Sequence, residues 1–444
     1  MRSANSNALA FSTRAATMGM IGTLDKDKRE VTVVGAGIAG MLAAYALDKS
    51  GYRVTLLEEK DRAGGLLRTR QTECGIAEAA ANSLLGSPAV IDLCRELGVE
   101  LVEVRKEAKG RYVLRDGKLR KFPLTIGETM TTLTHAAFTP AMNHAAGLDL
   151  GEWGRRHLGD AGVEFLLTPF VRGIYGVQPT EVGVIAAFPK LLVPAGRTLL
   201  GTFLRKSLQR PAPKREPAHM VAPKLGLGDL VAHLEGRLEQ RLRERFIKNM
   251  RITEPPDAPN VVLATPAYKA AQLLRHRFSD LAELLQAVKY TPMVSVTAFV
   301  DRNSLTRPVN GVGVLIPASE KRKCLGILFS SSAFAGRVKD ESRWASFTLM
   351  MGGSLDRQWV DASDDEINHA VQSELSEILG IRGAPLEIVI NRWPQAIPQY
   401  SIELPKLWQH ARQTWCAAPG RLLFGNYTGQ VSLRGMIESA SLLG

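Results

Sequence analysis

Three glycines and one glutamate near the start of the chain have the types and spacing needed to bind a dinucleotide. Gly35, Gly37 and Gly40 follow an apolar stretch, and Glu58 comes 23 residues after the first of them. The first glycine permits a tight turn, the second a close approach of the backbone to a pyrophosphate, and the third close packing of a helix on a strand. The helix N-terminus offers unpaired N–H groups to phosphates, and the glutamate can bind ribose hydroxyls. The pattern predicts a dinucleotide site, although a strand–helix turn that merely needs glycines shares part of it.

The elements that position these residues are predicted along the rest of the chain. Residues 31–57 begin as strand, helix and strand, and 111–122 alternate around Asp116-Gly117, which indicates a hairpin. Helices are expected over 87–103, 226–243 and 431–443 and through most of 124–210, and a linker over 211–224. Strands are expected at 261–266, 293–300, 312–316, 325–330, 346–350, 386–390 and 422–424.

These elements predict an α/β fold whose dinucleotide domain is discontinuous, because its parts lie at both ends and in the middle of the chain. Such a layout suits a large FAD protein better than an NAD protein. The predicted architecture is a Rossmann-like FAD-binding domain with an inserted α-helical domain and a second mixed sheet. The expected divisions are a disordered leader (1–29), the FAD-binding domain (30–86, 218–290 and 405–444), a helical substrate- and membrane-facing domain (87–217) and a substrate-binding sheet domain (291–404).

The composition excludes several classes of site. The four cysteines are scattered, and the eight histidines form no metal-binding cluster, so we expect no metal, no disulfide framework and no histidine-based chemistry. The net charge of +12 suits an anionic membrane surface or an acidic small molecule, or only solubility. We find no nucleic-acid-binding motif. Residues 1–29 have the composition of a disordered tail, which an organelle transit peptide shares.

Further segments resemble those of the flavin-dependent protoporphyrinogen oxidases, within the wider amine-oxidase-like flavoproteins. The wider resemblance rests on the glycine turn, Leu57-Glu58-Glu-Lys-Asp-Arg62-Ala-Gly64-Gly65, Val262-Leu-Ala-Thr-Pro266 and Gly425-Asn-Tyr-Thr-Gly429. The narrower resemblance rests on segments 111–123, 168–175, 187–189, 311–317, 325–331, 352–353 and 393–400.

The resemblance implies FAD as cofactor and assigns residues to it by position. The cofactor-binding residues that it implies are Gly35, Ala36, Gly37, Ile38, Ala39, Gly40, Glu58, Glu59, Arg62, Gly64, Gly65, Leu66, Ala80, Ala81, Asn82, Ser83, Asn426, Val431, Ser432 and Leu433. Asn82 and Arg111 are the implied substrate residues, since a guanidinium can bind a carboxylate through two hydrogen bonds. The alternatives are a helix cap for Asn82 and a solvated basic face for Arg111. A flat apolar cavity for a tetrapyrrole could be lined by Phe329, Phe334, Trp393 and Tyr400, but aromatic residues in strands lie in the core more often, so these four are not assigned to the site.

The chain departs from the family pattern in three places, one of which is Gly176-Val177-Gln178 after Tyr175, where the family commonly has Gly-Asp. Ala80-Ala81 stands where the family has Gly-Pro before Asn82, which places a methyl group beside the flavin position. The segment from Phe246 to Val261 is too short for the family's usual hairpin, so no adenine contact is assigned.

The function that the resemblance implies is oxidation of a porphyrinogen to a porphyrin in haem synthesis. Six electrons leave in three steps, with molecular oxygen as acceptor and hydrogen peroxide as product, and no side chain is assigned as acid or base because FAD carries the chemistry. Protoporphyrinogen IX and coproporphyrinogen III both remain open as substrates. The alternatives are an amine oxidase or polyene desaturase of the same clan, or a non-catalytic flavin or tetrapyrrole carrier. We expect a cytoplasmic protein; the basic amphipathic segment 197–210 is compatible with peripheral membrane contact, and a homodimer is left open.

Overall fold

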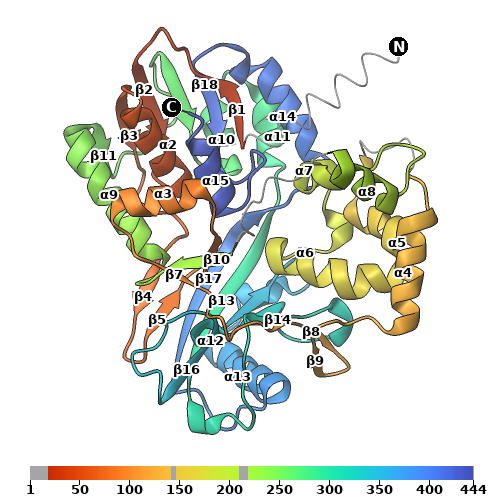
Figure 1. Cartoon of the computed structure of the whole chain (residues 1–444). Helices are drawn as coiled ribbons and strands as arrows, with labels where there is room; N and C mark the ends of the chain where they lie inside the picture. Colours follow the sequence, from red (N-terminus) through yellow and green to blue (C-terminus); the bar gives the residue numbers. More distant parts are fainter. Residues whose placement is uncertain (1–18, 142–146, 210–218, 444) are drawn as a thin grey trace.

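Two large sheets organise the chain, with a lobe of helices beside them (Figure 1). The computed structural model describes residues 19–141, 147–209 and 219–443. The α/β prediction is confirmed, since helices cover a mainly parallel sheet and a second, mixed sheet lies beyond it.

The first sheet has six strands drawn from three separate parts of the chain. Its order is β1 (Met20–Thr23), β18 (Arg421–Phe424), β12 (Asn260–Leu263), β2 (Glu30–Val34), β3 (Arg53–Leu57) and β11 (Phe246–Ile247). All neighbours are parallel except β1, which is antiparallel to β18. The prediction that residues 1–29 form a disordered leader is wrong for 20–23, because these residues pair with a strand about 400 positions away; residues 1–18 lie outside the described residues.

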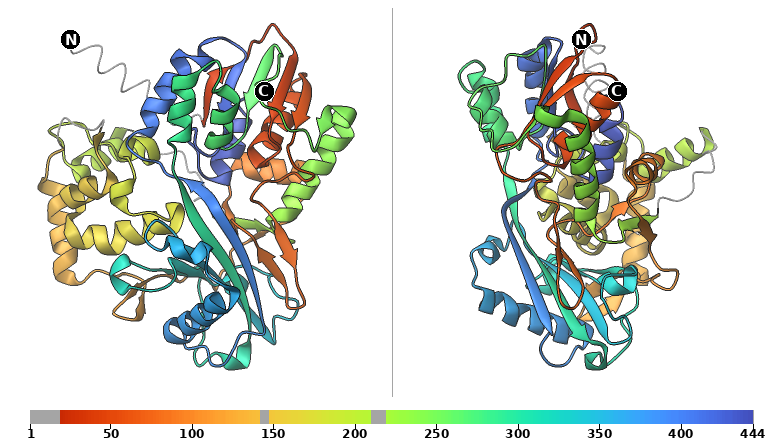
Figure 2. Two further views of the ribbon diagram at one scale, coloured as in Figure 1. Left: turned by 180° about the vertical axis from the view of Figure 1, so that it is seen from behind. Right: turned by 90° about the vertical axis from the view of Figure 1, so that its left-hand side faces the viewer.

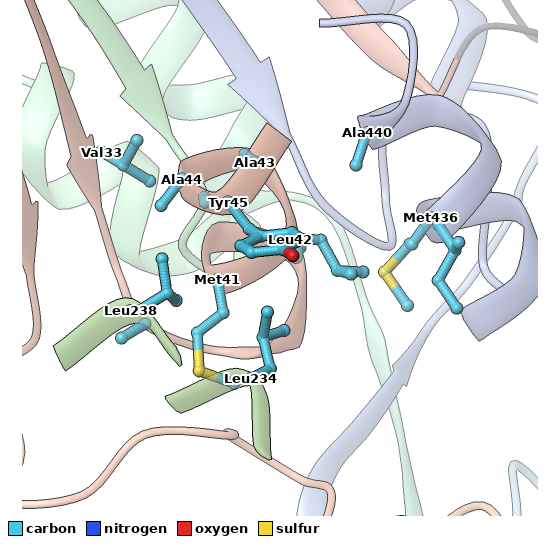
Figure 3. Close-up of a cluster of buried hydrophobic side chains, with 14 of the residues drawn as sticks. Val33, Met41, Leu42, Ala43, Ala44, Tyr45, Leu234, Leu238, Met436 and Ala440 are labelled. Carbon is cyan, nitrogen blue, oxygen red and sulfur yellow. The ribbon is translucent and has the colours of Figure 1, made fainter. Parts of the chain in front are cut away.

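Helices bury both faces of this sheet because its strands are apolar on both sides. One face is covered by α2 (Ile38–Lys49), α3 (Pro88–Leu97), α9 (Leu227–Leu242) and α15 (Leu433–Ala440), and the other by α10 (Ala267–Leu274), α11 (Ser279–Gln286) and α14 (Leu404–Gln413). Figure 3 shows the first of these cores, where Met41 of α2 lies near Leu234 and Leu238 of α9. On the other side of α2, Met436 of α15 points toward Leu42. The glycine turn at the start of α2 is therefore held on a rigid base.

The second sheet has seven strands and a helix on one face. Its order is β17 (Glu387–Pro398), β13 (Tyr290–Asp301), β16 (Trp344–Gly352), β15 (Gly326–Leu328), β14 (Gly313–Leu315), β8 (Arg111–Arg115) and β9 (Lys118–Arg120). Side chains of β13 alternate, so that Val294 and Val296 pack under α13 (Asp364–Glu374). In the view from behind (Figure 2), β13 and β17 run from beside the first sheet down into the second. These two long strands connect the two parts of the molecule.

The predicted hairpin at Asp116-Gly117 is confirmed, with φ angles of 53° and 67° at the turn. Its strands β8 and β9 extend the second sheet rather than the helical lobe, so the expected boundaries of 87–217 do not separate the two. The segment 87–103 also differs from the prediction of one helix, because α3 ends at Leu97. Gly98 then adopts a left-handed φ of 78°, and β7 (Leu101–Glu103) follows.

The lobe at the right of Figure 1 is helical, as predicted. It contains α4 (Ile126–Phe138), α5 (Leu150–Gly162), α6 (Thr168–Tyr175), α7 (Val184–Ala187) and α8 (Leu199–Gln209). Two small sheets join the parts: β6 (Leu84–Leu85), β10 (Met220–Pro223) and β7 form one, and β4 (Thr69–Gln71) and β5 (Ile76–Glu78) form the other. Because β10 is paired on both sides, the predicted linker 211–224 is wrong for 220–223; residues 210–218 lie outside the described residues. Within the described ranges, no helix has both the length and the apolar character needed to cross a membrane.

Candidate functional site

A cavity of about 1010 Å³ runs from the glycine turn to the second sheet. Its walls come from the β2–α2 turn, the loops after β3 and β11, the segment after β5, and parts of α6, α10, α15, β13, β15, β16 and β17. Ligand pockets commonly have volumes of about 300–1,000 Å³, so this cavity can hold a large ligand or two ligands side by side.

The glycine turn lies at one end of the cavity, and each of its glycines meets a different constraint. Gly35 has a φ of 97°, which L side chains rarely adopt. An added Cβ at Gly40 would lie 1.8 Å from the carbonyl oxygen of Gly35, so the helix can pack here only without a side chain. Gly37 differs, since an added Cβ there would meet no atom within 4 Å while the residue lines the cavity. This open space above the N-terminus of α2 fits a phosphate group.

Glu58 fixes the geometry beside this turn. One carboxylate oxygen, Oε2, accepts the N–H of Ala36 at 2.7 Å, and Oε1 accepts the N–H of Lys60 at 3.0 Å. A carboxylate has about four acceptor positions, so Glu58 retains capacity for ribose hydroxyls. The backbone N–H of Glu58 donates to Ile247 of β11 at 2.9 Å, which brings the end of β11 to the same part of the cavity.

The loop after β3 closes over the glycine turn. The N–H of Gly64 donates to the carbonyl of Ala36 at 2.9 Å, and Gly64 and Gly65 have φ angles of 92° and 61°. Arg62 donates from Nη1 to Ala63 at 3.2 Å and from Nη2 to Gly65 at 3.0 Å, so its guanidinium stabilises the loop. Burial lowers the pKa of this guanidinium.

The segment that carries Ala80-Ala81 is held by side chains of the second sheet. The indole N–H of Trp393 donates to the carbonyl of Ala79 at 2.6 Å, and the Thr348 hydroxyl donates to Oδ1 of Asn82 at 3.2 Å. The amide of Asn82 also donates to the carbonyl of Ala80 at 3.2 Å. Asn82 thus stabilises a loop that faces the cavity and does not cap a helix.

Glu78, the last residue of β5 before this loop, forms a buried ion pair with Arg337. Oε1 of Glu78 lies 3.6 Å from Nη1 of Arg337, and both side chains are almost completely buried. Glu78 also accepts the N–H of Leu227 at 2.8 Å and the hydroxyl of Thr69 at 2.7 Å. Burial raises the pKa of Glu78 to about 7 and lowers the pKa of Arg337.

The start of α15 also lines the cavity, through Val431, Ser432 and Leu433. Ser432 caps the helix by accepting the N–H of Gly435 at 3.1 Å. Positive partial charge at this N-terminus faces the cavity and favours negative charge on a bound group.

The structure brings most of the sequence-predicted residues together in one cavity. Those that line it are Gly35, Gly37, Ile38, Ala39, Glu58, Glu59, Arg62, Gly64, Gly65, Leu66, Ala80, Ala81, Asn82, Ser83, Asn426, Val431, Ser432 and Leu433. Ala36 and Gly40 lie behind this surface. Ala36 donates its N–H to Glu58, and Gly40 permits close packing of α2.

Arg111 does not line the cavity. It is exposed on β8, and its Nη2 lies 4.0 Å from the sulfur of Met220. Met220 pairs across the small sheet with Leu85, which lines the cavity and is 42% exposed. Arg111 is therefore placed outside the cavity, next to its rim.

Several lining residues were not assigned from the sequence. Met250 and Arg251 follow β11, whose two residues are too few to show a periodic pattern in the sequence. Tyr268 and Lys269 follow the Ala-Thr-Pro turn, and this motif could have identified them as lining residues. Trp393, which was expected in the core, lines the cavity.

Comparisons with known proteins identify the same architecture. The family model for flavin containing amine oxidoreductases matches residues 38–444. Protoporphyrinogen oxidase 2 of Arabidopsis thaliana is 26% identical, over 93% of this chain and 92% of that protein. Coproporphyrinogen III oxidase of Bacillus subtilis is 23% identical, over 90% of this chain and 93% of that protein. A solved structure from Exiguobacterium sp. 255-15, provisionally named protoporphyrinogen oxidase, superposes with a TM-score of 0.74 at 22% identity and covers 95% of this chain and 98% of that one.

Proposed function

The chain belongs to the flavin containing amine oxidoreductase family, and from this premise we propose that it oxidises a porphyrinogen to the corresponding porphyrin. It is an oxidoreductase with FAD as cofactor. The observation that carries the finer proposal is the similarity to porphyrinogen oxidases along almost the whole chain, the second sheet included. A match limited to the dinucleotide domain would support only flavin binding.

The residues at the glycine turn fit FAD. The open space at Gly37 suits a pyrophosphate, and the free acceptor positions of Glu58 suit a ribose. The capped N-terminus of α15 suits an electron-accepting ring. When bound, FAD supplies a two-electron acceptor. The loop with Ala80-Ala81 is fixed to the second sheet through Ala79 and Asn82 and lines the same cavity.

The chain's own contribution to the reaction is to bind the macrocycle and to exclude water. The wall from α6 and the second sheet presents Ile174, Leu328, Met350 and Trp393, which suit a flat apolar ring. None of the described residues lining the cavity is a histidine, so no imidazole base is assigned to the protons that the pyrrole nitrogens release. Overall, the porphyrinogen loses six electrons and six protons, and three oxygen molecules are reduced to three hydrogen peroxide molecules.

Arg111 is proposed to bind a propionate at the rim. Its exposed guanidinium is linked through Met220 to Leu85 of the lining, and a carboxylate would bind it through two hydrogen bonds.

Association with an anionic membrane surface is a second proposal. Large exposed side chains gather on the helical lobe and hairpin: Phe122, Ile126, Met130, Leu133, Phe138 and Phe170. Sedimentation with anionic and neutral vesicles tests it, and equal recovery in the supernatant with and without vesicles would contradict it.

The proposed function is tested by red fluorescence. Porphyrins fluoresce in the red and porphyrinogens do not, so the purified flavoprotein should produce a red signal from a porphyrinogen in air, with release of peroxide. Apoprotein without added FAD is the control. If fluorescence stays at the control rate while peroxide appears with amines, the chain is an amine oxidase instead.

A further inference from the structure

The face of the second sheet that looks away from α13 carries a group of buried hydroxyls. Side chains of a strand alternate between the two faces of a sheet. In β16, Phe347 and Leu349 belong to the core under α13, so Thr348 lies on the other face. Thr297 of β13 is its partner across the strand pair, and Ser330 follows β15. Thr297 and Thr348 are each 1% exposed, so both hydroxyls need hydrogen-bond partners.

Thr348 is the centre of a hydrogen-bonded chain. Its Oγ1 lies 3.0 Å from the hydroxyl oxygen of Ser330, 3.3 Å from that of Thr297 and 3.2 Å from Oδ1 of Asn82. The carboxamide nitrogen of Asn82, Nδ2, donates to the carbonyl of Ala80 at 3.2 Å. These contacts join the second sheet to the loop that lines the cavity.

The carbonyl of Ala80 fixes the direction of every bond in this chain. A carbonyl can only accept, so Nδ2 of Asn82 must face it and Oδ1 must face Thr348. Because this amide oxygen also can only accept, the single proton of the Thr348 hydroxyl is used on Asn82. Ser330 and Thr297 must then donate their own protons to Thr348. The chain therefore prevents the carboxamide of Asn82 from flipping.

One N–H of Asn82 is left for a ligand. Nδ2 carries two protons, and within the described residues only Ala80 accepts one of them. Asn82 is half-buried and lines the large cavity. It also lines a second cavity of about 10 Å³, which has room for about one water molecule, so a larger ligand meets Asn82 only from the large cavity.

We infer that Thr348 is a positioning residue, which through Asn82 holds one N–H toward a hydrogen-bond acceptor of a bound ligand. The pyrrole N–H groups of a porphyrinogen do not qualify, because they are donors themselves. Suitable acceptors are the carbonyl groups and unprotonated nitrogens of an oxidised flavin ring, or the carboxylates and unprotonated nitrogens of a porphyrin. Only the second source rests on the proposed function, since FAD follows from the family.

Thr348→Val tests this role, because valine has almost the same shape and no hydroxyl. Titration of the apoprotein with FAD, and of the holoenzyme with protoporphyrin IX, gives two dissociation constants without turnover. The Kd of the ligand that accepts the N–H should rise about 2- to 10-fold, which is the effect of one hydrogen bond. The ligand whose Kd rises identifies the source of the acceptor. Thr348→Ser keeps the hydroxyl and should restore wild-type binding.

Thr291→Val is the matched control. Thr291 is a buried threonine of β13 that does not line the cavity, and its hydroxyl has no hydrogen-bond partner within the described residues, so both Kd values should stay unchanged. Thr348→Val leaves the Thr297 hydroxyl without an acceptor; if this variant folds poorly, Thr297→Val/Thr348→Val removes both hydroxyls and should show the same rise in Kd. The inference is wrong if Thr348→Val binds both ligands like the wild type, or if Thr291→Val raises the same Kd equally.

A second experiment tests whether Asn82 donates. Asn82→Asp has nearly the same size but its carboxylate can only accept, whereas Asn82→Ala removes the polar group. The Asp variant should bind the affected ligand more weakly than the Ala variant, because two acceptors then face each other. Equal or tighter binding by the Asp variant would overturn the inference. A holoenzyme that fails to oxidise porphyrinogens would refute the proposed function, but it would not change the result of the FAD titration.

Discussion

Gly37→Ala should separate cofactor binding from folding. Gly37 has φ −63° and ψ 171°, which any residue adopts, and an added Cβ would meet no atom within 4 Å. The substitution therefore introduces neither strain nor a clash in the apoprotein. Reduced freedom of the unfolded chain should even stabilise the fold, by about 0.4–1 kcal/mol.

The same methyl group fills the space that suits a phosphate. Hydrogen bonds to charged groups contribute about 1.5–3 kcal/mol each, so preventing one such contact should raise the Kd for FAD about 10- to 150-fold. The assay combines urea unfolding of the apoprotein with titration of apoprotein by FAD, followed through quenching of flavin fluorescence.

Gly236→Ala is the matched control for this experiment. Gly236 lies inside α9, and its added Cβ likewise meets nothing within 4 Å, so the control should gain about 1 kcal/mol of stability without a change in FAD affinity. If Gly37→Ala binds FAD as tightly as the wild type, the phosphate does not lie at this turn and the assignment of the cofactor site is wrong.

Three further substitutions test the fold and the buried charges. Gly40→Ala places its Cβ 1.8 Å from a backbone oxygen that cannot move away cheaply, so the urea midpoint of the apoprotein should fall by the equivalent of at least about 1–3 kcal/mol. Leu238→Ala removes a fully buried side chain from the core in Figure 3 and should cost about 2–5 kcal/mol in the same assay. Burial raises the pKa of Glu78 from 4.5 to about 7, so the folded state holds a proton that the unfolded state releases, and stability should fall as the pH rises from 4.5 to 7 and change no further from this cause above it. Glu78→Gln should flatten this part of the urea-unfolding profile between pH 5 and pH 8, and an unchanged slope would contradict the assignment.

Local sequence patterns predicted the elements whose stability comes from near neighbours. The strand–helix–strand start and the Asp116-Gly117 hairpin are examples, because apolar periodicity and turn residues specify them within about 30 residues. The elements that were missed are short strands such as β1, β7 and β10. Each has three or four residues and exists because a distant partner supplies its hydrogen bonds.

The site residues also divide into those that local sequence motifs predicted and those that depend on distant contacts. Residues within the glycine turn and the loop after β3 were found because each motif is continuous in sequence. The position of Arg111 relative to the cavity was not predictable, because it depends on the contact with Met220 and on the pairing of β10 with β6. The composition of the wall from α6 and the second sheet was also hidden, since α6 and four separate strands contribute to it.

The departure at Ala80-Ala81 takes its meaning from contacts across the cavity rather than from the sequence around it. A proline would restrict the backbone of this loop by itself. Here two side chains of the second sheet hold the loop at its ends, Trp393 through Ala79 and Thr348 through Asn82. Trp393 also lines the cavity, so one residue shapes the apolar wall and fixes the loop that faces the cofactor region. The second sheet therefore sets the spacing between the apolar wall and this loop, which explains how two alanines can occupy this position while the loop keeps its place.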